Sequence, residues 1–488
     1  MSSPATTSAL RTPAGRFWLL AAAAVLASRL AHRNILWADE DYHLAAAVQL
    51  LHGKMLYRDL WYDKPPLNAL FDVLFGGWYG IPLRLACTLV VLATCGLGYK
   101  LAARLWGRAD GFAAAALLAF FHIFYLPAAI LPLEPDTLIL LPALAAIYAA
   151  VEARPFLAGI AAGFAMLLTP KGVFALAPCL FFVPRAQWWM LLAGFAAPNA
   201  VALGWLAATG ALADYGEQVW RWGWLYISKP GADPQAQRGG LAVLDWLGFH
   251  AALAIAAGLY FWREKEPLRW RLFAWAGIAF IAAAVGGRFA PRYFNLLMAA
   301  LAIPAAHGLV LAGNATPRRW IWLALIAVAL LIPAARFGPR YVTLALEDLR
   351  GEPHAWGDLA MNLESRIASD VVRKLAKPGD TIFIWGYRPD IVAYTRLSVA
   401  SRFWDSQAVT GVPADRHLSD TRSIAPSWAV ANSVQLARTR PTFIVDGLSA
   451  YNPQMDIARY GRVLQPWADR SCLEARDERM TIYRLCHP

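Results

Sequence analysis

Apolar runs about as long as a membrane-spanning helix recur through the first two-thirds of this chain and constrain its fold more than any other feature. A helix needs about 20 predominantly apolar residues to cross the hydrocarbon core of a bilayer. The sequence therefore predicts an α-helical polytopic membrane protein with a bundle of about eleven transmembrane helices. We expect these spans near residues 17–36, 81–103, 111–131, 135–151, 155–170, 171–184, 187–209, 241–262, 268–285, 291–312 and 320–335.

The composition agrees with this class. Of the 488 residues, 58% are hydrophobic and only 16% are charged, whereas a soluble protein carries about a quarter charged residues. The 22 tryptophans and 17 tyrosines suit a protein that anchors at two membrane interfaces. A net charge of +12 could indicate nucleic-acid binding, but the basic residues fall mostly in short clusters between apolar runs. Membrane topology explains such clusters, so we expect no nucleic-acid partner.

The basic clusters also predict which loops share a side of the membrane. If the N-terminus is cytoplasmic, alternate crossings place every strong cluster between spans on the cytoplasmic side, as the positive-inside rule requires. The first apolar run is long and lacks a clear cleavage site, so we expect a retained span. Segment 66–80 must then lie in the outer interface as a short helix, because a full crossing would invert all later clusters. The cytoplasmic basic residues are Arg11, Arg16, Lys100, Arg104, Arg108, Arg154, Arg185, Arg263, Lys265, Arg269, Arg271, Arg318 and Arg319, and Arg29 and Arg33 are exceptions.

The same alternation divides the chain into two predicted domains. Residues 1–336 form the transmembrane domain, with an external first loop at 37–80, and residues 337–488 form an external tail. Short β-rich runs bounded by Gly or Pro at 380–386, 441–447 and 480–486, preceded by a helical pattern at 365–380, predict a small α/β domain in this tail.

Five cysteines are distributed between these two predicted domains. Cys87, Cys95 and Cys179 fall in spans, where we interpret them as small apolar residues. Cys472 and Cys486 lie in the external tail, where disulfides can form, and the sequence leaves open whether these two are bonded.

Ionisable side chains gather immediately after the first span, in "WADEDYHLAAAVQLLHGKMLYRDLWYDKPPL" at 37–67. On a helix that starts near Ala38, Asp39, Tyr42 and His43 share one face. Acids in a first helical turn often serve only to complement the helix dipole. Here they sit at the outer end of a span, where ionisable groups are costly and usually functional. We interpret His43 as a packed residue.

Further polar groups occur at other outer junctions. Glu134 and Asp136 flank a proline between two spans, and they could equally belong to a solvated loop. Arg288 and Arg292 flank a Gly-rich turn, where they could bind lipid phosphates without specificity. Trp222 lies in an aromatic loop, 214–231, that suits either an interfacial belt or a lid stacked on sugar.

The motifs "W-A-D-E-x-Y" and "Y-R-D…Y-D-K-P-P-L" resemble those of the GT-C superfamily, the glycosyltransferases that use lipid-phosphate sugars. The nearest branch holds protein O-mannosyltransferases and the bacterial aminoarabinose transferases of lipid A. "LPLEPDTLILLP" after the third span, "R-Y-F" at Arg292–Phe294 and the tail passage "PGDTIFIWGYRPDIVAYTRLSVASRF" agree in kind. The resemblance implies a GT-C-like bundle that carries an extracytoplasmic α/β domain.

The resemblance also assigns roles to single residues. Asp39 matches the position of the catalytic base, and Glu40 completes an acidic pair. The "E-K-P" of the aminoarabinose transferases becomes Asp63-Lys64-Pro65, so Lys64 is kept for the donor phosphate while the acid is one methylene shorter. Some members need a divalent metal such as Mg or Mn and others do not; Glu40, Asp63 and Asp136 are the candidate ligands.

The predicted activity is transfer of a sugar from a polyprenyl-phosphate donor to an extracytoplasmic lipid, polysaccharide or protein, in the inner (cytoplasmic) membrane. The acceptor loses a proton as it attacks, which requires a carboxylate, and one displacement inverts the anomeric centre. The leaving phosphate requires cations, and Lys64 is our first candidate. The alternative interpretation is that the Lys64 side chain simply extends to the lipid headgroups. We expect Lys64, Arg58, Arg288 and Arg292 at the donor phosphate, and Tyr42, Tyr57, Asp63, Glu134, Asp136 and Trp222 at the substrate.

Two other functions fit a chain of this composition. A transporter or flippase of lipid-linked saccharides would place ions near the bilayer midplane, often in repeated halves, whereas the ions here gather at one outer edge and no repeat is evident. A non-catalytic assembly or sensor protein would tolerate loss of the first-loop acids. The sequence leaves the sugar open among mannose, glucose, arabinose and aminoarabinose.

Overall fold

The computed structural model describes residues 12–125, 132–229, 235–314, 317, 319–352, 360–457, 463–476 and 479–486. The chain forms two compact units. We call Met1–Arg33, Ile81–Val201 and Pro234–Glu352 the helical unit, and Asn34–Gly80, Ala202–Asp233 and Pro353–Pro488 the mixed unit. The first loop thus packs with the tail. The boundary expected after residue 336 falls inside a helix that continues to Arg350.

Every predicted span contains a helix. In chain order these are α2 (Pro13–Leu30), α5 (Ile81–Leu105), α6 (Arg108–Ile123), α8 (Leu140–Val151), α9 (Pro155–Leu168), α10 (Val173–Phe182), α11 (Trp188–Ala208), α14 (Gln235–Phe249) with α15 (Ala251–Arg263), α16 (Leu268–Ala284), α17 (Asn295–Asn314) and α18 (Arg319–Arg350). The short helix α7 (Pro135–Leu138) precedes α8. Residues 126–131 of the third predicted span, as well as Arg11 and Arg318, lie outside the described residues.

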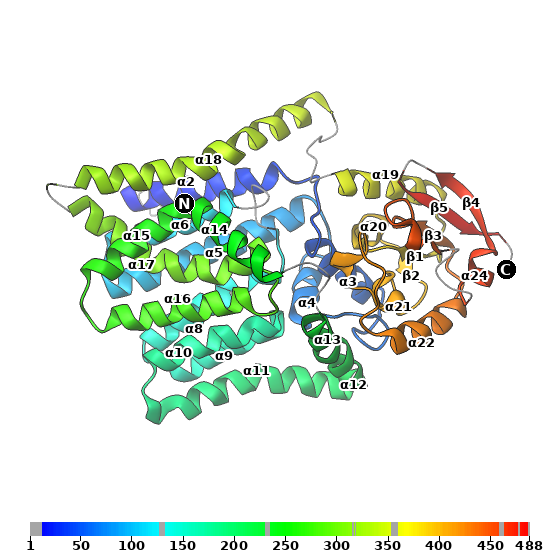
Figure 1. Cartoon of the computed structure of the whole chain (residues 1–488), viewed down its shortest axis with the longest axis horizontal. Coiled ribbons are helices and arrows are strands. Elements are labelled where there is room, and N and C mark those ends of the chain that lie inside the picture. Colours follow the sequence, from blue (N-terminus) through cyan, green and yellow to red (C-terminus); the bar gives the residue numbers. More distant parts are fainter. Residues whose placement is uncertain are drawn as a thin grey trace, which may run out of the picture. The chain divides into compact units, whose positions relative to one another are not determined.

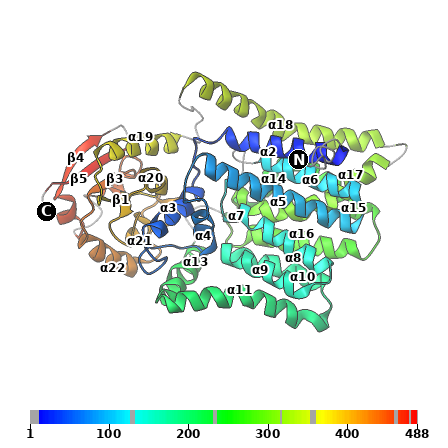
Figure 2. The same ribbon diagram turned by 180° about the vertical axis from the view of Figure 1, so that it is seen from behind.

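The helices differ in whether they are long enough to cross a membrane. Within the described chain, Ile81–Leu105, Arg185–Ala208, Pro291–Asn314 and Arg319–Arg350 are long and apolar enough by themselves. Arg238–Phe249 and Ala251–Arg263 form a fifth candidate, bent by 84°. Pro135–Val151, Pro155–Leu168 and Pro170–Phe182 are shorter apolar helices. These shorter helices, which contain α8, α9 and α10, pack side by side in both views (Figures 1 and 2).

Close backbone approach holds the centre of the helical unit together. Helix α17 packs along α15, and most of its residues are buried. A Cβ added to Gly308 of α17 would lie 1.8 Å from the Ala256 carbonyl oxygen of α15. Because only a hydrogen fits at that point, glycine lets the two backbones touch.

The mixed unit contains a five-stranded sheet in the order β2-β1-β3-β5-β4. Strands β1 (Thr381–Trp385), β2 (Ser398–Val399) and β3 (Phe443–Asp446) are parallel, while β5 (Thr481–Leu485) runs antiparallel to β3 and to β4 (Ser471–Arg476). Figure 1 shows α19 (Ala360–Leu375) and α20 (Pro389–Thr395) on one side of the sheet and α22 (Pro426–Ala437) on the other. The smaller helices α21 (Gln407–Thr410) and α24 (Gln465–Ala468) connect strands.

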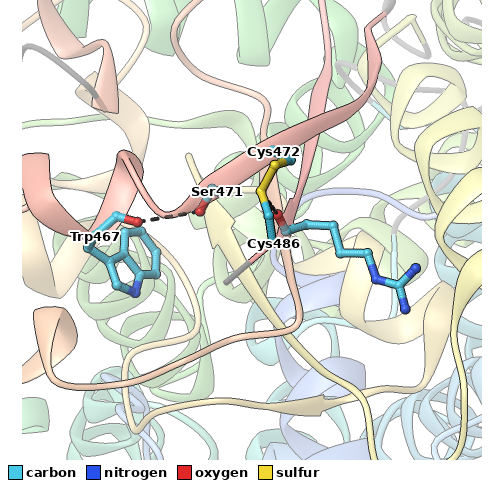
Figure 3. The surroundings of a disulfide bond; sticks show 5 residues. Trp467, Ser471, Cys472 and Cys486 are labelled. Atoms are coloured by element: carbon cyan, nitrogen blue, oxygen red, sulfur yellow. Dashed lines mark hydrogen bonds between the residues drawn. A yellow bond between two sulfur atoms is a disulfide. The ribbon is translucent and has the colours of Figure 1, made fainter. Parts of the chain in front are cut away.

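The α/β prediction for the tail is confirmed. The three β-rich runs form β1, β3 and β5, and the expected helix is α19, which begins at Ala360. The sequence pattern misses β2, which has two residues, and β4, whose residues are mostly exposed. Cys472 of β4 and Cys486, which follows β5, form a disulfide across this edge of the sheet (Figure 3).

First-loop elements complete the mixed unit. Helix α3 (Glu40–Leu51) packs against α4 (Leu67–Val73) and α20. The Gln49 side chain of α3 donates to the Leu397 carbonyl and accepts from the Val399 N–H, both at 2.9 Å, so it continues the hydrogen bonding of β2. Segment 66–80 contains α4 followed by turns, and seven helical residues are too few to cross a membrane, as the charge pattern requires. Residues 202–233 contribute α12 (Leu212–Tyr215), a π-helical turn at Gly216–Arg221 and α13 (Trp222–Ser228).

Replacing Gly308 by Ala tests the contact between α15 and α17. We expect Gly308→Ala to lower the free energy of unfolding by about 1–3 kcal/mol, because the new methyl group would overlap the Ala256 carbonyl. Thermal unfolding of the purified protein in detergent measures this. Gly258→Ala on α15 is the matched control, since nothing lies within 4 Å of its added Cβ and alanine is the better helix former. Equal melting temperatures for the two variants would contradict the packing.

Candidate active site

The backbone that leads into Asp63 and Lys64 is held at two points by one side chain. Gln218, buried in the π-helical turn, donates from Nε2 to the Tyr57 carbonyl and accepts the Tyr62 N–H through Oε1, both at 2.8 Å. Tyr57 has a positive φ of 68°, which is uncommon for a residue with a side chain. π-Helical turns often occur at functional sites, and this turn directs the Gln218 side chain toward the loop.

Further bonds close the same loop. The Tyr57 hydroxyl donates to the Lys64 carbonyl at 2.8 Å, and the Trp61 N–H donates to the Arg402 carbonyl at 2.7 Å. The Arg402 guanidinium also donates to the Tyr57 carbonyl at 2.7 Å and pairs with Asp214 at 2.7 Å. The backbone before Lys64 is therefore held from the first loop, from 202–233 and from the tail.

Asp39 lies at the start of α3 in a strained conformation. Its φ is 74°, and its side chain makes no capping hydrogen bond to the helix. The reading of Asp39 as a simple helix cap is therefore not supported. Positive φ values at residues other than glycine cost on the order of 1–3 kcal/mol and cluster at active sites. Asp39 is partly exposed, whereas Glu40 is fully buried.

The charges of Asp39 and Lys64 both influence the pKa of one imidazole, that of His43. His43 is buried, and its Nδ1 lies 2.5 Å from the Tyr62 hydroxyl. Burial lowers the pKa of His43 to about 3, the Asp39 carboxylate opposes that shift and the Lys64 ammonium adds to it. The imidazole is therefore neutral at physiological pH. The structure brings the predicted base and the predicted phosphate-binding cation to one residue, although they are far apart along the loop.

Lys64 is paired with its neighbour in sequence. Its Nζ lies 3.4 Å from Asp63 Oδ1. The Lys64 side chain is 35% exposed and that of Asp63 10%, so the ammonium is the more accessible member of the pair. Asp63 Oδ2 also lies 3.5 Å from Gln407 Nε2 of the tail.

Aromatic rings from the tail surround Tyr42 of the first loop. Tyr42 is fully buried and stacks on Tyr62 at a centroid distance of 5.3 Å and on Tyr387 at 5.7 Å. Trp404 lies 4.9 Å from Tyr42 at an interplanar angle of 48°. Sequence reasoning misses Tyr387, Trp404 and Gln218, because no motif in the first loop refers to these distant positions.

Several buried carboxyl groups lie around this centre. Burial raises the pKa of Asp41, and Asp390 and Asp39 add to the shift by repulsion. Burial likewise raises the pKa of Asp390 to about 6, and that of Asp405 to about 7 with repulsion from Asp63. Acids with raised pKa values stay at least partly protonated near neutral pH, which limits the negative charge gathered in one place.

Three predicted site residues of the mixed unit have structural contacts that account for their positions. Arg58 is exposed, grips Asp59 through two hydrogen bonds of 2.9 and 2.7 Å and donates to the Thr209 carbonyl at 3.1 Å. Tyr57 is fully buried, and its hydroxyl donates a hydrogen bond to the Lys64 carbonyl. Trp222 is 3% exposed and packs edge-on against Trp61 in the core of the unit. A direct role of these three in substrate binding stays a prediction.

The remaining predicted residues form a second polar cluster in the helical unit. Lys171 Nζ lies 2.9 Å from Asp136 Oδ1 and 3.2 Å from the centre of the Tyr293 ring. Arg292 pairs with the buried Glu134 at 3.6 Å. Arg288 is partly buried in the turn between α16 and Pro291–Phe294.

Two of the three acids proposed as metal ligands are paired with cations. Asp63 is paired with Lys64, and Asp136 is paired with Lys171. In the part of the chain that the structure describes, no group of three His, Cys, Asp or Glu side chains could hold a metal. Because Mg²⁺ is often held by only one or two carboxylates together with substrate phosphates, a metal at Glu40, Asp63 or Asp136 stays a prediction.

The raised pKa of Asp405 predicts a pH-dependent stability. A carboxyl group whose pKa rises from about 4 in the unfolded chain to about 7 in the fold destabilises the protein as pH rises through that window. Asp405→Asn keeps the acceptor for the Gln407 N–H and removes the charge. We expect its gain in the free energy of unfolding over the wild type, followed by thermal unfolding, to grow between pH 4 and 7 and to level off above, at on the order of 2–4 kcal/mol.

Asp420→Asn is the control with the opposite sign. Hydrogen bonds from Arg422 lower the pKa of Asp420 to about 2, so its stabilisation is present above pH 4 and is lost as pH falls toward 2. Asp420→Asn should show no gain that grows toward neutral pH. Parallel pH profiles for Asp405→Asn and the wild type would contradict the assignment.

Comparison with known proteins identifies the fold. No protein-family model matches the chain, and no curated protein sequence matches it. ArnT from Cupriavidus metallidurans bound to undecaprenyl phosphate shares 15% identity over 98% of each chain, with a TM-score of 0.61. Its apo form shares 14% over 99% of each, with a TM-score of 0.57. The arabinofuranosyltransferase AftD from mycobacteria shares 15% over 97% of this chain and 40% of its own, with a TM-score of 0.51. These neighbours are GT-C glycosyltransferases, and this chain has the GT-C fold.

Proposed function

We propose that this protein is an integral membrane glycosyltransferase that moves a sugar from a polyprenyl phosphate to an acceptor on the extracytoplasmic face of the cytoplasmic membrane. The observation that carries the proposal is that the first loop holds Lys64, paired with Asp63 at 3.4 Å, and the partly exposed Asp39 in one unit, where both charges act on the buried His43. A carboxylate and an ammonium in one site are the two charges that transfer from a phosphate donor requires. The GT-C fold and a structural neighbour that binds undecaprenyl phosphate support the same conclusion.

The bond changes assign a role to each charge. The acceptor hydroxyl oxygen attacks the anomeric carbon, and its proton passes to the Asp39 carboxylate. The bond between the anomeric carbon and the phosphate oxygen breaks, and its electron pair stays on the polyprenyl phosphate. Lys64 stabilises the charge that develops there, and this effect is strong in a site that excludes water. A single displacement of this kind inverts the anomeric configuration.

The pairing of Lys64 with Asp63 prepares the ammonium for this role. A nearby carboxylate favours the charged form of a lysine and limits the positions of its side chain. Asp63 is the more buried partner, so an incoming phosphate meets Lys64 first. No step is assigned to a metal. The acceptor is a lipid, a glycan or a protein hydroxyl.

Asp39→Asn tests the proposed base. We expect the rate of sugar transfer from a labelled polyprenyl-phosphate sugar in membranes to fall about a hundredfold to ten-thousandfold, because the amide cannot accept the proton. Asp370→Asn, which removes a surface charge paired with Arg373, should keep full activity. Full transfer by Asp39→Asn would remove it as the base. Movement of lipid-linked sugar between leaflets without a new glycosidic bond would favour a flippase.

Lys64→Met tests the phosphate contact. We expect transfer to fall about a hundredfold and inhibition by bare polyprenyl phosphate to weaken, because the leaving group loses its cation. Lys64→Arg should restore part of the activity, since it keeps the charge but not the geometry. Inhibition constants of the three proteins, measured with undecaprenyl phosphate, provide the comparison. An unchanged inhibition constant for Lys64→Met would place the phosphate elsewhere.

A further inference from the structure

A tyrosine of the α/β tail reaches the acids of the first loop. Tyr387 follows β1 after Gly386, whose φ of 120° allows the chain to turn sharply between strand and helix. The strand order places β1 between β2 and β3, although β2 lies between them in sequence. In parallel sheets, ligands bind at the carboxyl ends of strands where the order reverses in this way. Tyr387 occupies that point of the sheet.

Tyr387 lies among side chains of the proposed site. One face of its ring stacks on Tyr42 at 5.7 Å. Its hydroxyl interacts electrostatically with Asp39, with Asp63 and with Asp41. Asp39 is the proposed base, and Asp63 is the partner of Lys64, so this hydroxyl lies near both ends of the bond change.

Tyr387 differs from the other tyrosines of the site in its hydrogen bonding. Tyr57 donates to the Lys64 carbonyl, Tyr62 lies 2.5 Å from His43 Nδ1, and Tyr42 accepts the Asp63 N–H at 3.2 Å. The Tyr387 hydroxyl has no hydrogen-bond partner among the residues that the structure describes, and Tyr387 remains partly exposed. A hydroxyl without a hydrogen-bond partner of its own, among neighbours that are hydrogen-bonded, is available to bond a ligand.

The charge environment sets what Tyr387 can do. Desolvation by the packed side chains raises the pKa of its hydroxyl, and the carboxylates of Asp39, Asp63 and Asp41 contribute to the shift. The phenol therefore stays protonated and acts as a hydrogen-bond donor. It is not a second base.

We propose that Tyr387 is a substrate-contacting residue whose hydroxyl donates a hydrogen bond to a ring hydroxyl of the sugar being transferred. The proposal rests on the function given above, because the sugar ring must lie between the attacking oxygen near Asp39 and the leaving phosphate near Lys64. Tyr42 occupies one face of the tyrosine ring, so the sugar meets its hydroxyl end. The α/β tail thereby takes part in recognition of the donor.

Tyr387→Phe tests this contact, because it removes the hydroxyl and keeps the stacking on Tyr42. The probes are undecaprenyl phosphate alone and undecaprenyl phosphate carrying mannose, glucose or arabinose, with affinity measured by quenching of tryptophan fluorescence. For the sugar donor that the wild type prefers, we expect Tyr387→Phe to bind about 3- to 10-fold more weakly, the effect of one neutral hydrogen bond. Its affinity for bare undecaprenyl phosphate and its melting temperature should stay unchanged.

Tyr451→Phe is the matched control, since that hydroxyl bonds Glu364 within the tail. It should leave donor affinity unchanged and lower thermal stability. Equal donor binding by Tyr387→Phe and the wild type would overturn the proposal even if sugar transfer is observed. A wild type that binds bare undecaprenyl phosphate and the sugar-bearing lipids equally would also overturn it. A wild type that binds a sugar donor more tightly than the bare lipid, yet forms no glycosidic bond, would refute the transferase function while leaving the Tyr387 contact measurable.

Discussion

The two hydrogen bonds of the Gln218 carboxamide are the constraint on which the proposed chemistry depends. They join the Tyr57 carbonyl and the Tyr62 N–H, and the segment between and after these residues delivers Asp63 and Lys64. Each buried hydrogen bond of this kind contributes about 0.5–1.5 kcal/mol, and leaving a partner unsatisfied costs more. The loop therefore keeps one conformation, including the unfavourable φ of Tyr57. An ammonium that must meet a phosphate at a fixed place requires such a backbone.

Burial then separates the acids of the mixed unit into two kinds. Asp41, Asp390 and Asp405 are buried with raised pKa values, so part of their potential charge is absent near neutral pH. Asp39 is partly exposed at the start of α3. A cluster that looks strongly acidic in sequence thus leaves Asp39, the proposed base, as an accessible carboxylate. Aromatic rings pack around the buried Tyr42 of the same unit.

Local sequence signals predict most of the fold and only the first half of the site. Long apolar runs predict the helices, and short apolar runs predict strands such as β1 and β3. Both signals lie in neighbouring residues of the sequence. Asp39 and Lys64 also stand out because they belong to a cluster of ionisable residues in a mostly apolar part of the chain. Gln218 and Tyr387 have ordinary neighbours in sequence, and their importance arises from contacts with distant parts of the first loop. Trp222 illustrates a different case, because this residue of the aromatic loop packs edge-on against Trp61 in the core of the mixed unit, a contact that its sequence neighbours do not indicate.

The bond between Gln49 and the edge of β2 links parts of the chain that emerge from the ribosome at very different times. Its two partners lie 348 and 350 positions later in the sequence. When α3 is first synthesised, the strand that it completes has not yet been made. The contacts between Gln49 and β2 can therefore form only after every helix of the helical unit has been synthesised. A chain that ends before β2 leaves both hydrogen-bonding groups of the Gln49 carboxamide without these partners.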